Sequence, residues 1–399
     1  MKIGIISNLY PPLIRGGAEV IAALEAQGLK DAWQHVFVIS SRPYNGLKSL
    51  AISKNGDADI PVYRFYPLNI YHYLNDFRFP GFIRLLWHLF DSFNIFSYFK
   101  IKKILLKEKP DVVITHNIMG LGFLTPVLLR RLKIKHIHTL HDVQLATPSG
   151  LIVFGQENSW QHKIFKFLGY VKLMRYLWQS PDIVIAPSRF LLNYYKDLGF
   201  FSKSKQVVVP NPVKKLFKLN KKESYNLELL YLGQIHKAKG ILELIKTVKS
   251  LSISSLRLSI IGVGPDLAEA KKIAAKDKRI KFYGWLQHNE MVPIISKMDI
   301  LVVPSLCYEN SPTVIYEILA LGLPVLAANI GGVAELISEG KNGWTYPAGD
   351  FKTLSKKITS IHRQRDKLGN LADNCHRSVG PYLLEKYIEK VLDLANSPR

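Results

Sequence analysis

Short runs of apolar residues alternate with longer amphipathic stretches along the first half of the chain. The runs that predict strands span residues 2–7, 35–39, 111–115, 134–140, 182–186 and 206–209. Stretches with helical periodicity lie between most of them. Alternating strands and helices are typical of a parallel sheet that is covered by helices on both faces, so the first half predicts a doubly wound α/β domain.

The same plan begins again after Asn211-Pro212, which we interpret as a hinge, and a lysine-rich linker at 214–222. The second set of predicted strands spans residues 227–232, 256–261, 280–283, 300–303 and 324–328. A chain of 399 residues is longer than one core usually needs. We therefore predict two doubly wound, Rossmann-like domains, residues 1–212 and 213–380, that face each other across a cleft.

The end of the chain predicts a further helix. Residues 382–396 carry a wide apolar stripe, which consists of Leu383, Tyr387, Val391 and Leu394 with Leu384, Ile388 and Leu392 beside them. So wide an apolar face must be buried. We expect residues 381–399 to return to the first domain and pack on it.

One stretch of the second half, residues 302–327, combines chemistry with clear structural signals. A buried strand is followed by a polar loop that contains Glu309, and Pro312 suits the first turn of a helix that ends at Gly322. Glu309 then precedes the helix, and Glu317 lies about a turn inside it. The free N–H groups between them could bind a phosphate, while the carboxylates accept hydrogen bonds from hydroxyls. A helix cap with a solvated glutamate explains the same pattern.

Two features of the first half add weaker signals. Gly16-Gly17 enter a helix after the first strand, where backbone N–H groups can approach an anion closely, with a plain strand-to-helix turn as the alternative. The spacing is not that of a dinucleotide fingerprint. His141 follows the strand at 134–140, at the end of a parallel sheet where ligands bind. A histidine with a purely structural role is the alternative. His136 and His138 share a strand face, but no carboxylate or cysteine cluster joins them, so no metal site is predicted.

The net charge of +23 implies an anionic partner. Nucleic acid is disfavoured because no recognised binding module accompanies the charge. Cys307 and Cys375 are the only cysteines, which favours a reducing cytoplasm, and the N-terminus reads as a strand rather than a signal peptide. Residues 112–129 are uncharged, but they contain His116, Asn117 and Pro126, so strand, loop and helix are expected there rather than a membrane span.

Basic and aromatic residues are interleaved at 78–109 and again at 163–178. Such surfaces can lie on anionic lipid, although packing of aromatic helices within the domain is the alternative. Asp57-Ala58-Asp59 matches a DxD pattern that can hold a divalent metal. It stands in a polar, glycine-containing stretch, and we interpret it as a surface loop.

Glu309 and Glu317 together resemble the E-x7-E signature of retaining nucleotide-sugar glycosyltransferases of the GT-B fold, in glycosyltransferase family 4. The resemblance is strengthened by Gly331 to Glu335, by Asn342-Gly343, and by Tyr231 to Gly240. It covers nearly the whole chain and is thin between residues 42 and 109.

The resemblance implies a role for each matching residue. Gly16 and Gly17 would face the donor diphosphate, and His141 would lie beside the donor sugar. Lys239 would clamp the diphosphate together with an arginine, but this chain has Gln234 at the arginine position, which removes a bidentate cation. The remaining implied contacts are Glu309 to sugar hydroxyls, Asn310, Ser311, Pro312 and Thr313 to diphosphate and sugar through the backbone, and Glu317 to the ribose diol.

The predicted function is that of a retaining, metal-independent hexosyltransferase that needs no cofactor. It would move sugar from a nucleotide-sugar donor to a glycan or lipid-linked acceptor in the synthesis of a bacterial surface polysaccharide, lipopolysaccharide or glycolipid. We expect it in the cytoplasm, peripheral to the inner face of the membrane. A non-catalytic partner subunit, which Gln234 keeps open, and a nucleotide-sugar 2-epimerase on the same fold are the alternatives.

Overall fold

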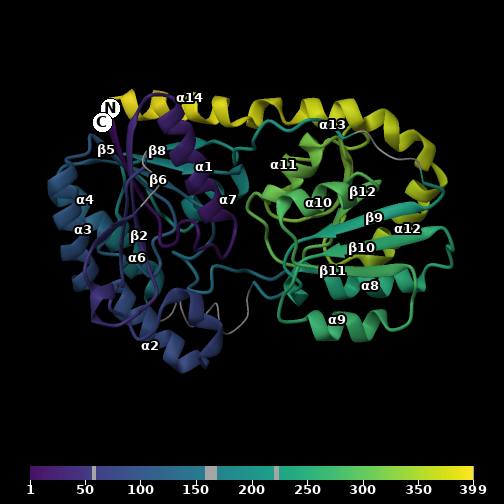
Figure 1. Cartoon of the computed structure of the whole chain (residues 1–399), viewed down its shortest axis with the longest axis horizontal. Helices are drawn as coiled ribbons and strands as arrows, with labels where there is room; N and C mark the ends of the chain where they lie inside the picture. The colour runs from purple at the N-terminus through teal and green to yellow at the C-terminus, as the bar shows by residue number, and fades with distance from the viewer. Residues whose placement is uncertain (56–59, 158–168, 220–223, 399) are drawn as a thin grey trace. The chain divides into compact units, whose positions relative to one another are not determined.

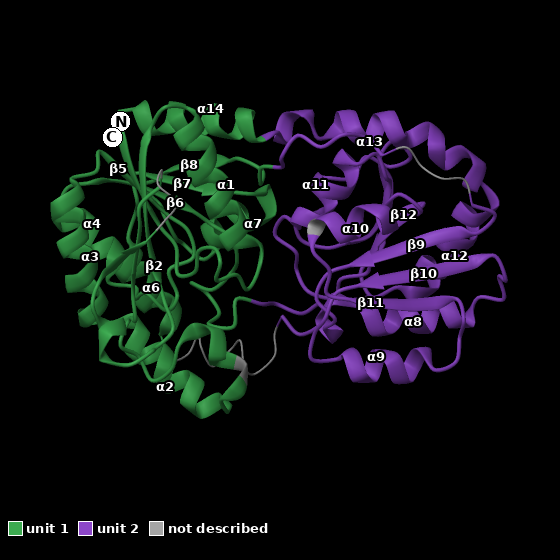
Figure 2. Ribbon diagram, in the orientation of Figure 1, with its two compact units in different colours: residues 1–150, 159–212, 384–399 green, residues 151–158, 213–383 purple. Residues whose placement is uncertain are grey.

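The computed structural model describes residues 1–55, 60–157, 169–219 and 224–398. The chain divides into two compact units, which Figure 2 shows in different colours. Unit 1 comprises Met1–Gly150, Ser159–Pro212 and Leu384–Arg399, and unit 2 comprises Leu151–Asn158 and Val213–Leu383. Residues 151–158 therefore lie with unit 2 instead of the first domain, and the final segment of unit 1 begins at residue 384 rather than 381.

The sheet of unit 1 has eight strands in the order β3-β4-β2-β1-β5-β6-β7-β8. Neighbouring strands are parallel except for β3 and β4, which are antiparallel. The strands are β1 (Lys2–Ile6), β2 (His35–Ser41), β3 (Ser53–Asn55), β4 (Val62–Phe65), β5 (Val112–Thr115), β6 (Lys135–Thr139), β7 (Ile183–Ala186) and β8 (Lys205–Val208). The predicted parallel sheet is confirmed.

The described helices of unit 1 connect these strands, and Figure 1 labels them. They are α1 (Gly17–Asp31), α2 (Gly81–Ser92), α3 (Ile95–Glu108), α4 (Thr125–Arg131), α6 (Tyr170–Trp178), α7 (Arg189–Asp197) and α14 (Leu384–Asn396), with short 3₁₀ turns at Leu47–Leu50 and Tyr73–Arg78. One buried cluster joins the apolar residues of the central strands to those of α1 and α14. Burial of this cluster is the main stabilising term for the unit.

Helix α14 packs along α1 in unit 1. A Cβ atom on Gly28 of α1 would lie 2.6 Å from Cγ1 of Ile388, so the two helices approach closely because residue 28 is glycine. Lys135 of β6 donates to the carbonyl oxygens of Leu394 and Ala395 at 2.9 and 2.8 Å. A buried ammonium at the C-terminal end of a helix satisfies its last carbonyls and complements its dipole.

The sheet of unit 2 has six parallel strands in the order β11-β10-β9-β12-β13-β14. The strands are β9 (Leu227–Leu232), β10 (Leu256–Ile261), β11 (Ile280–Gly284), β12 (Ile300–Val303), β13 (Val325–Asn329) and β14 (Gly343–Pro347). The helices are α8 (Ile241–Ser250), α9 (Leu267–Ala274), α10 (His288–Ile295), α11 (Thr313–Ala320), α12 (Phe351–Arg363) and α13 (Ala372–Ser378), with 3₁₀ turns at Lys237–Lys239, Val333–Glu335, Arg365–Leu371 and Gly380–Tyr382. Two separate apolar clusters pack on this sheet.

The strand order reverses between β1 and β5 in unit 1 and between β9 and β12 in unit 2. In doubly wound sheets, ligands bind beyond the carboxyl ends of the strands at such a reversal. The loops that follow β1 and β5, and those that follow β9 and β12, are therefore where a ligand site is expected within each unit.

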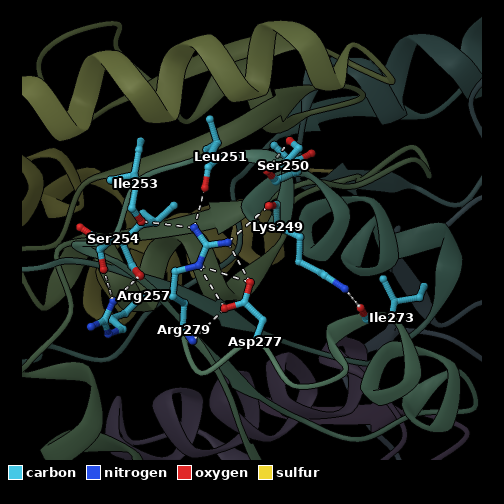
Figure 3. Close-up of polar contacts among 11 residues, drawn as sticks. Lys249, Ser250, Leu251, Ile253, Ser254, Arg257, Ile273, Asp277 and Arg279 are labelled. Carbon is cyan, nitrogen blue, oxygen red and sulfur yellow. Dashed lines mark hydrogen bonds and ion pairs between the residues drawn. The ribbon is translucent and has the colours of Figure 1, made fainter.

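Arg279 lies at the amino ends of the unit 2 strands, opposite the carboxyl ends. Its guanidinium donates to the carbonyl oxygens of Leu251 and Ile253 at 2.6 and 3.2 Å and pairs with Asp277 at 2.8 Å (Figure 3). The fork of the guanidinium suits several acceptors at once. Arg279 thereby joins the chain after α8 to the start of β11, at the end of the sheet away from the expected site.

Three strands were not predicted from the sequence: β3, β4 and β14. The first two fall where the sequence resembles the family least. The residues of β14 do not form a continuous apolar run, so the sequence contains no strand signal there. The predicted C-terminal helix is present but begins at Leu384, because the preceding residues form the 3₁₀ turn Gly380–Tyr382. No helix in the described ranges has both the length and the apolar composition that crossing a bilayer requires.

Some predictions fall outside the described residues. These are the loop that contains Asp57 and Asp59, residues 163–168 of the second basic stretch, and residues 220–222 of the linker. The remaining part of the linker belongs to unit 2, where Val213 pairs with Leu383 in an isolated parallel bridge. The cleft expected between the two domains stays a prediction.

Candidate functional site

Lys239 and Glu309 form an ion pair at the carboxyl ends of β9 and β12. Nζ of Lys239 lies 2.7 Å from Oε1 of Glu309, and Oγ of Ser305 donates to the same oxygen at 2.7 Å. Burial lowers the pKa of Lys239, but the Glu309 carboxylate more than offsets this effect and raises that pKa to about 12. The sequence prediction placed both residues at the donor site, and the structure brings them together.

The loop that carries Glu309 is held by backbone contacts on two sides. Gly332 N–H donates to the Glu309 carbonyl oxygen at 2.7 Å, and Gly331 has φ +62° with its missing Cβ only 2.2 Å from that oxygen. On the other side, the N–H groups of Leu306 and Cys307 both donate to the Ala238 carbonyl oxygen at 2.9 Å. Backbone hydrogen bonds thus hold the loop on both sides, and only glycine fits at position 331.

Residues 151–157 also support this loop, which the sequence did not predict. Phe154 N–H donates to the Leu306 carbonyl oxygen at 2.7 Å, and Tyr308 N–H donates to the Ile152 carbonyl oxygen at 2.9 Å. Val153 and Cys307 form an antiparallel bridge. The apolar run LIVF between two glycines was a signal for this short extended segment.

Helix α11 begins directly after Pro312, as predicted, and ends before Gly322, whose φ is +88°. Thr313 is its first residue, so the N–H groups of the first turn face the loop of Glu309. Oγ of Ser311 lies 2.5 Å from the hydroxyl oxygen of Tyr316, which fixes the entry to the helix. This arrangement provides the positive end of a helix dipole beside the Lys239–Glu309 pair.

Glu317 lies in the second turn of α11. Burial raises the pKa of its carboxyl group to about 7. Within the described part of the chain, no hydrogen-bond partner of this carboxylate is found. A half-buried carboxylate with unused acceptor capacity at a predicted ligand site is suited to accept hydrogen bonds from a ligand.

Gln234 has an exposed side chain in the loop after β9, and its carbonyl oxygen accepts a hydrogen bond from the Tyr231 hydroxyl at 2.7 Å. The loop is closely packed against the next one, since a Cβ on Gly262 would lie 1.9 Å from the Gly233 carbonyl oxygen. An arginine at position 234 would therefore have an exposed side chain on an ordered backbone.

In unit 1, Gly16 and Gly17 are exposed at the start of α1. Glu19 folds back on this turn and accepts a hydrogen bond from Gly16 N–H at 2.8 Å, with only 3% of its surface exposed. Glu19 thus caps the helix, and the role of the glycine pair in donor binding stays a prediction.

His141 follows β6 and is hydrogen-bonded within unit 1. Its Nε2 lies 2.8 Å from Nδ1 of His116, which follows β5. Nε2 of His116 lies 3.2 Å from Oε2 of Glu25 on α1. Burial and the neighbouring His116 lower the pKa of His141 well below 6.5, so its imidazole is neutral at pH 7.

His136 and His138 have structural roles. The Thr115 hydroxyl oxygen lies 2.8 Å from Nε2 of His136 and 3.0 Å from Nδ1 of His138, and both rings pack on Trp178. Among the residues that the structure describes, no group of three or more His, Cys, Asp or Glu side chains could hold a metal ion.

Sequence reasoning missed Glu25, His116 and Tyr387 as members of the His141 environment. The signal for Glu25 was present, because it interrupts the apolar face of α1 that Ala22, Ala26 and Leu29 form. A carboxylate at a core position of an amphipathic helix needs a buried partner.

Two protein-family models match successive parts of the chain. The model described as "Glycosyltransferase Family 4" matches residues 15–215, about half of the chain. The chain belongs to glycosyltransferase family 4. The model described as "Glycosyl transferases group 1" matches residues 213–377 of this glycosyltransferase and so includes Lys239, Glu309 and Glu317.

A curated relative from Bacillus subtilis (strain 168), a glycosyltransferase assigned provisionally to teichuronic acid biosynthesis, is 26% identical over 406 residues, which covers 95% of this chain and 94% of the relative. Sucrose-phosphate synthase from Thermosynechococcus elongatus has a similar structure, with a TM-score of 0.76, 18% identity and 98% of both chains covered. HepE from Anabaena, solved in complex with UDP-glucose, has a TM-score of 0.69 and 17% identity over 100% of both chains. These likenesses establish the GT-B fold of this glycosyltransferase, as the sequence predicted.

Proposed function

We propose that this glycosyltransferase moves a sugar from a nucleoside-diphosphate sugar to a glycan or lipid-linked acceptor, with retention of anomeric configuration and without a metal ion. The observation that carries the proposal is the Lys239–Glu309 pair beside the start of α11, at the point where the strand order of unit 2 reverses. HepE, which has the same fold, binds UDP-glucose, and this supports a nucleotide-sugar donor.

In this proposal, charge that develops on the leaving diphosphate is stabilised by the Lys239 ammonium and by the N–H groups of Asn310, Ser311 and Thr313. These groups are already ordered, so little reorganisation is needed as the bond breaks. Glu309 accepts hydrogen bonds from hydroxyls of the transferred sugar, and Glu317 accepts them from the ribose diol. Gly17 provides its backbone N–H group to the diphosphate, and Gly16, whose N–H is hydrogen-bonded to Glu19, lets the chain approach it closely. His141 contacts the donor sugar.

The bond from the anomeric carbon to the diphosphate oxygen breaks, and a bond from that carbon to the acceptor oxygen forms on the same face. The acceptor proton passes to the departing diphosphate, so none of the chain's carboxylates has to act as a nucleophile. Retention follows because attack and departure use one face of the sugar.

A panel of UDP-, GDP-, ADP- and dTDP-sugars tests the activity. We expect slow release of nucleoside diphosphate from one donor without an acceptor, the same rate with EDTA, and at least a tenfold loss in Lys239→Met. Release from no donor, together with no thermal stabilisation by any nucleoside diphosphate, would favour a non-catalytic partner subunit. Inhibition by EDTA that added Mg²⁺ or Mn²⁺ reverses would contradict metal independence.

A surface of unit 1 supports a lipid-linked acceptor. Helix α2 has several large apolar side chains outside and polar side chains inside. Phe82, Leu89 and Phe90 are 69%, 57% and 60% exposed, whereas His88 and Asp91 are buried beside Trp87, the apolar side chain that α2 turns inward. Oδ2 of Asp91 accepts a hydrogen bond from Gly120 N–H at 2.8 Å, which fixes the polar face inward. An apolar face directed to solvent is typical of an interaction site.

The apolar residues continue into α3, and we call this set the α2–α3 surface: Phe82, Leu85, Leu86, Leu89, Phe90, Phe93, Ile95 and Phe99, all at least 46% exposed. Helix α3 also carries Lys100, Lys102, Lys103 and Lys107. Apolar side chains beside lysines on a chain of net charge +23 are suited to an anionic bilayer surface. We propose that the enzyme binds the inner face of the cytoplasmic membrane through this surface, where it contributes to surface polysaccharide synthesis.

A further inference from the structure

A series of polar groups in close contact leads from the C-terminal helix to His141 within unit 1. The Tyr387 hydroxyl on α14 donates to Oε2 of Glu25 on α1 at 3.0 Å. The same oxygen lies 3.2 Å from Nε2 of His116, and Nδ1 of His116 lies 2.8 Å from Nε2 of His141. The His116 and His141 rings are stacked, with centroids 5.1 Å apart. The four groups come from α14, from α1 and from the loops that follow β5 and β6.

The inner members of this series are fully buried. Glu25 and His116 have 0% of their surface exposed, and Tyr387 has 3%. Burying a carboxylate and an imidazole costs free energy that their mutual attraction offsets only in part, so an apolar side chain at position 25 would serve the core better. This cost indicates that the buried carboxylate and imidazole have a role other than the packing of α1. His141 is the residue at the far end of the series.

The hydrogen positions follow from the chemistry of each group. A carboxylate only accepts hydrogen bonds, so the Tyr387 hydroxyl donates to Glu25. The Glu25 carboxylate, 3.2 Å from Nε2 of His116, attracts a proton and so favours the His116 tautomer that is protonated on Nε2. Nδ1 of a His116 that carries one proton then has a lone pair and accepts from Nε2–H of His141. His141 is consequently held as the tautomer with its proton on Nε2, and its Nδ1 is a hydrogen-bond acceptor.

We propose that Glu25, His116 and Tyr387 are positioning residues that fix the ring orientation and the tautomer of His141. The proposal rests on the proposed function, in which His141 contacts the donor sugar. A His141 held in this way does not have to rotate or exchange a proton during the reaction. Tyr387 makes the position of α14 part of this arrangement.

Nitrogen-15 NMR of histidine-labelled full-length protein tests the tautomer directly, with His141→Gln used to assign the His141 signals. In the wild type we expect Nε2 to show the chemical shift of a protonated nitrogen and Nδ1 that of an unprotonated one. In Glu25→Gln, which keeps the shape but lacks the charge, we expect the two shifts to move toward each other as tautomers mix. A protonated Nδ1 in the wild type, or unchanged shifts in the variant, would overturn the proposal.

Turnover provides a second readout that a purely structural role would not change. Release of nucleoside diphosphate from the donor identified in the panel should fall about 10- to 100-fold in kcat in Glu25→Gln, with KM changed less than about twofold. Tyr387→Phe should show a smaller loss of the same kind, and it keeps the proposal testable if Glu25→Gln fails to fold.

Tyr71→Phe is the matched control, because its buried hydroxyl also donates to a carboxylate in unit 1, Asp76, at 2.9 Å. It should lower the melting temperature by a similar amount and leave kcat unchanged. Equal losses of kcat in Tyr71→Phe and Tyr387→Phe would contradict a specific role. If the wild type releases nucleotide from no donor, the proposed function fails, while the NMR result still decides whether His141 is held as inferred.

Discussion

The Lys239 ammonium and the Glu309 carboxylate, 2.7 Å apart, come from loops that follow neighbouring strands 70 residues apart in sequence. The side chain of Glu309 is only 12% exposed and that of Lys239 is 32% exposed. Glu309 is therefore paired with a cation that, in the proposed function, also contacts the diphosphate. The ion pair holds both side chains in position, as a site that binds a sugar hydroxyl and a phosphate side by side requires.

Lys239→Met tests whether this pair serves ligand binding as well as stability. The variant leaves Glu309 largely buried without its cation, so we expect a loss of about 1–2 kcal/mol in the free energy of unfolding, below that of a fully buried pair. Nucleoside diphosphate affinity should also fall. Adding Glu309→Gln to Lys239→Met should recover the stability but not the affinity, since the leftover charge is removed and the cation is still absent. Recovery of both quantities in the double variant would show that Lys239 does not contact the diphosphate.

Glu309 and Glu317 should differ in their kinetic effects. Glu317→Ala is expected to weaken nucleotide binding, because the ribose diol is held equally in the ground and transition states. Glu309→Ala should mainly lower kcat, because contacts near the reacting carbon strengthen as charge develops. Isothermal titration with the nucleoside diphosphate and steady-state kinetics with the donor separate the two effects. The opposite pattern would reverse the assigned roles.

The raised pKa of Glu317 predicts a pH-dependent stability. In the folded protein this pKa is about 7, above the ordinary value of 4.5, so the folded state holds the proton more tightly than the unfolded state. The resulting stabilisation is full below about pH 4.5 and is lost as the pH rises through 7. Glu317→Gln stays neutral, so it should exceed the wild type by about 3 kcal/mol at pH 8 and by little at pH 5.

Urea unfolding at both pH values measures this difference. Glu269→Gln, an exposed change on α9, is the control and should alter stability little at either pH. A difference between Glu317→Gln and the wild type that is the same at pH 5 and pH 8 would mean that the carboxyl group is not held as the structure indicates.

How far the sequence predicts this site depends on whether its signals are local. Pro312 and Gly322 delimit α11, so the placement of Glu317 in the helix and Glu309 before it could be predicted from a single stretch. The contact between Tyr387 and Glu25 could not, because it joins residues 362 positions apart and requires α14 to pack on α1. Periodicity indicates that a face is buried but does not indicate which partner covers it.

The same distinction applies to the strands. Long apolar runs such as β9, β10 and β12 were predicted with their observed bounds, because each is buried on both faces. Strand β3, with three residues, pairs only with β4 at the edge of the sheet. Its burial is slight, so no apolar pattern in the sequence indicates it.

Gln234→Arg tests the departure from the family pattern. Gln234 is exposed on an ordered loop, so an arginine there can reach a ligand without rearranging the core. If the diphosphate lies at this loop, its binding should strengthen by roughly 1–3 kcal/mol, the scale of a hydrogen bond between charged groups. Gln364→Arg adds the same charge to another exposed glutamine of unit 2, after α12, and should change affinity little. Equal gains in both variants would indicate general electrostatic attraction instead of a site.

Membrane binding through the α2–α3 surface predicts a strong dependence on lipid charge and salt. The wild type should bind vesicles that contain anionic lipid at low salt, dissociate as salt is raised, and bind neutral vesicles poorly. Replacing Lys100, Lys102, Lys103 and Lys107 with Gln should weaken binding by up to about 1 kcal/mol for each lysine near the surface. Replacing Lys271, Lys272, Lys276 and Lys278, which are exposed on unit 2, removes the same charge and should have little effect.

The apolar part of the surface gives an independent test of the same binding. Leu85, Leu89 and Phe90 are 47%, 57% and 60% exposed, so changing them to Ser should not lower the melting temperature, in contrast to changes in the core. Vesicle co-sedimentation should nevertheless fall, because these side chains would no longer enter the headgroup region. A drop in melting temperature with unchanged co-sedimentation would mean that α2 packs within the protein, and a soluble acceptor would then fit the enzyme better. Loss of co-sedimentation in both the serine and the glutamine variants, with nucleotide binding intact, would place the enzyme at the membrane through this helix pair.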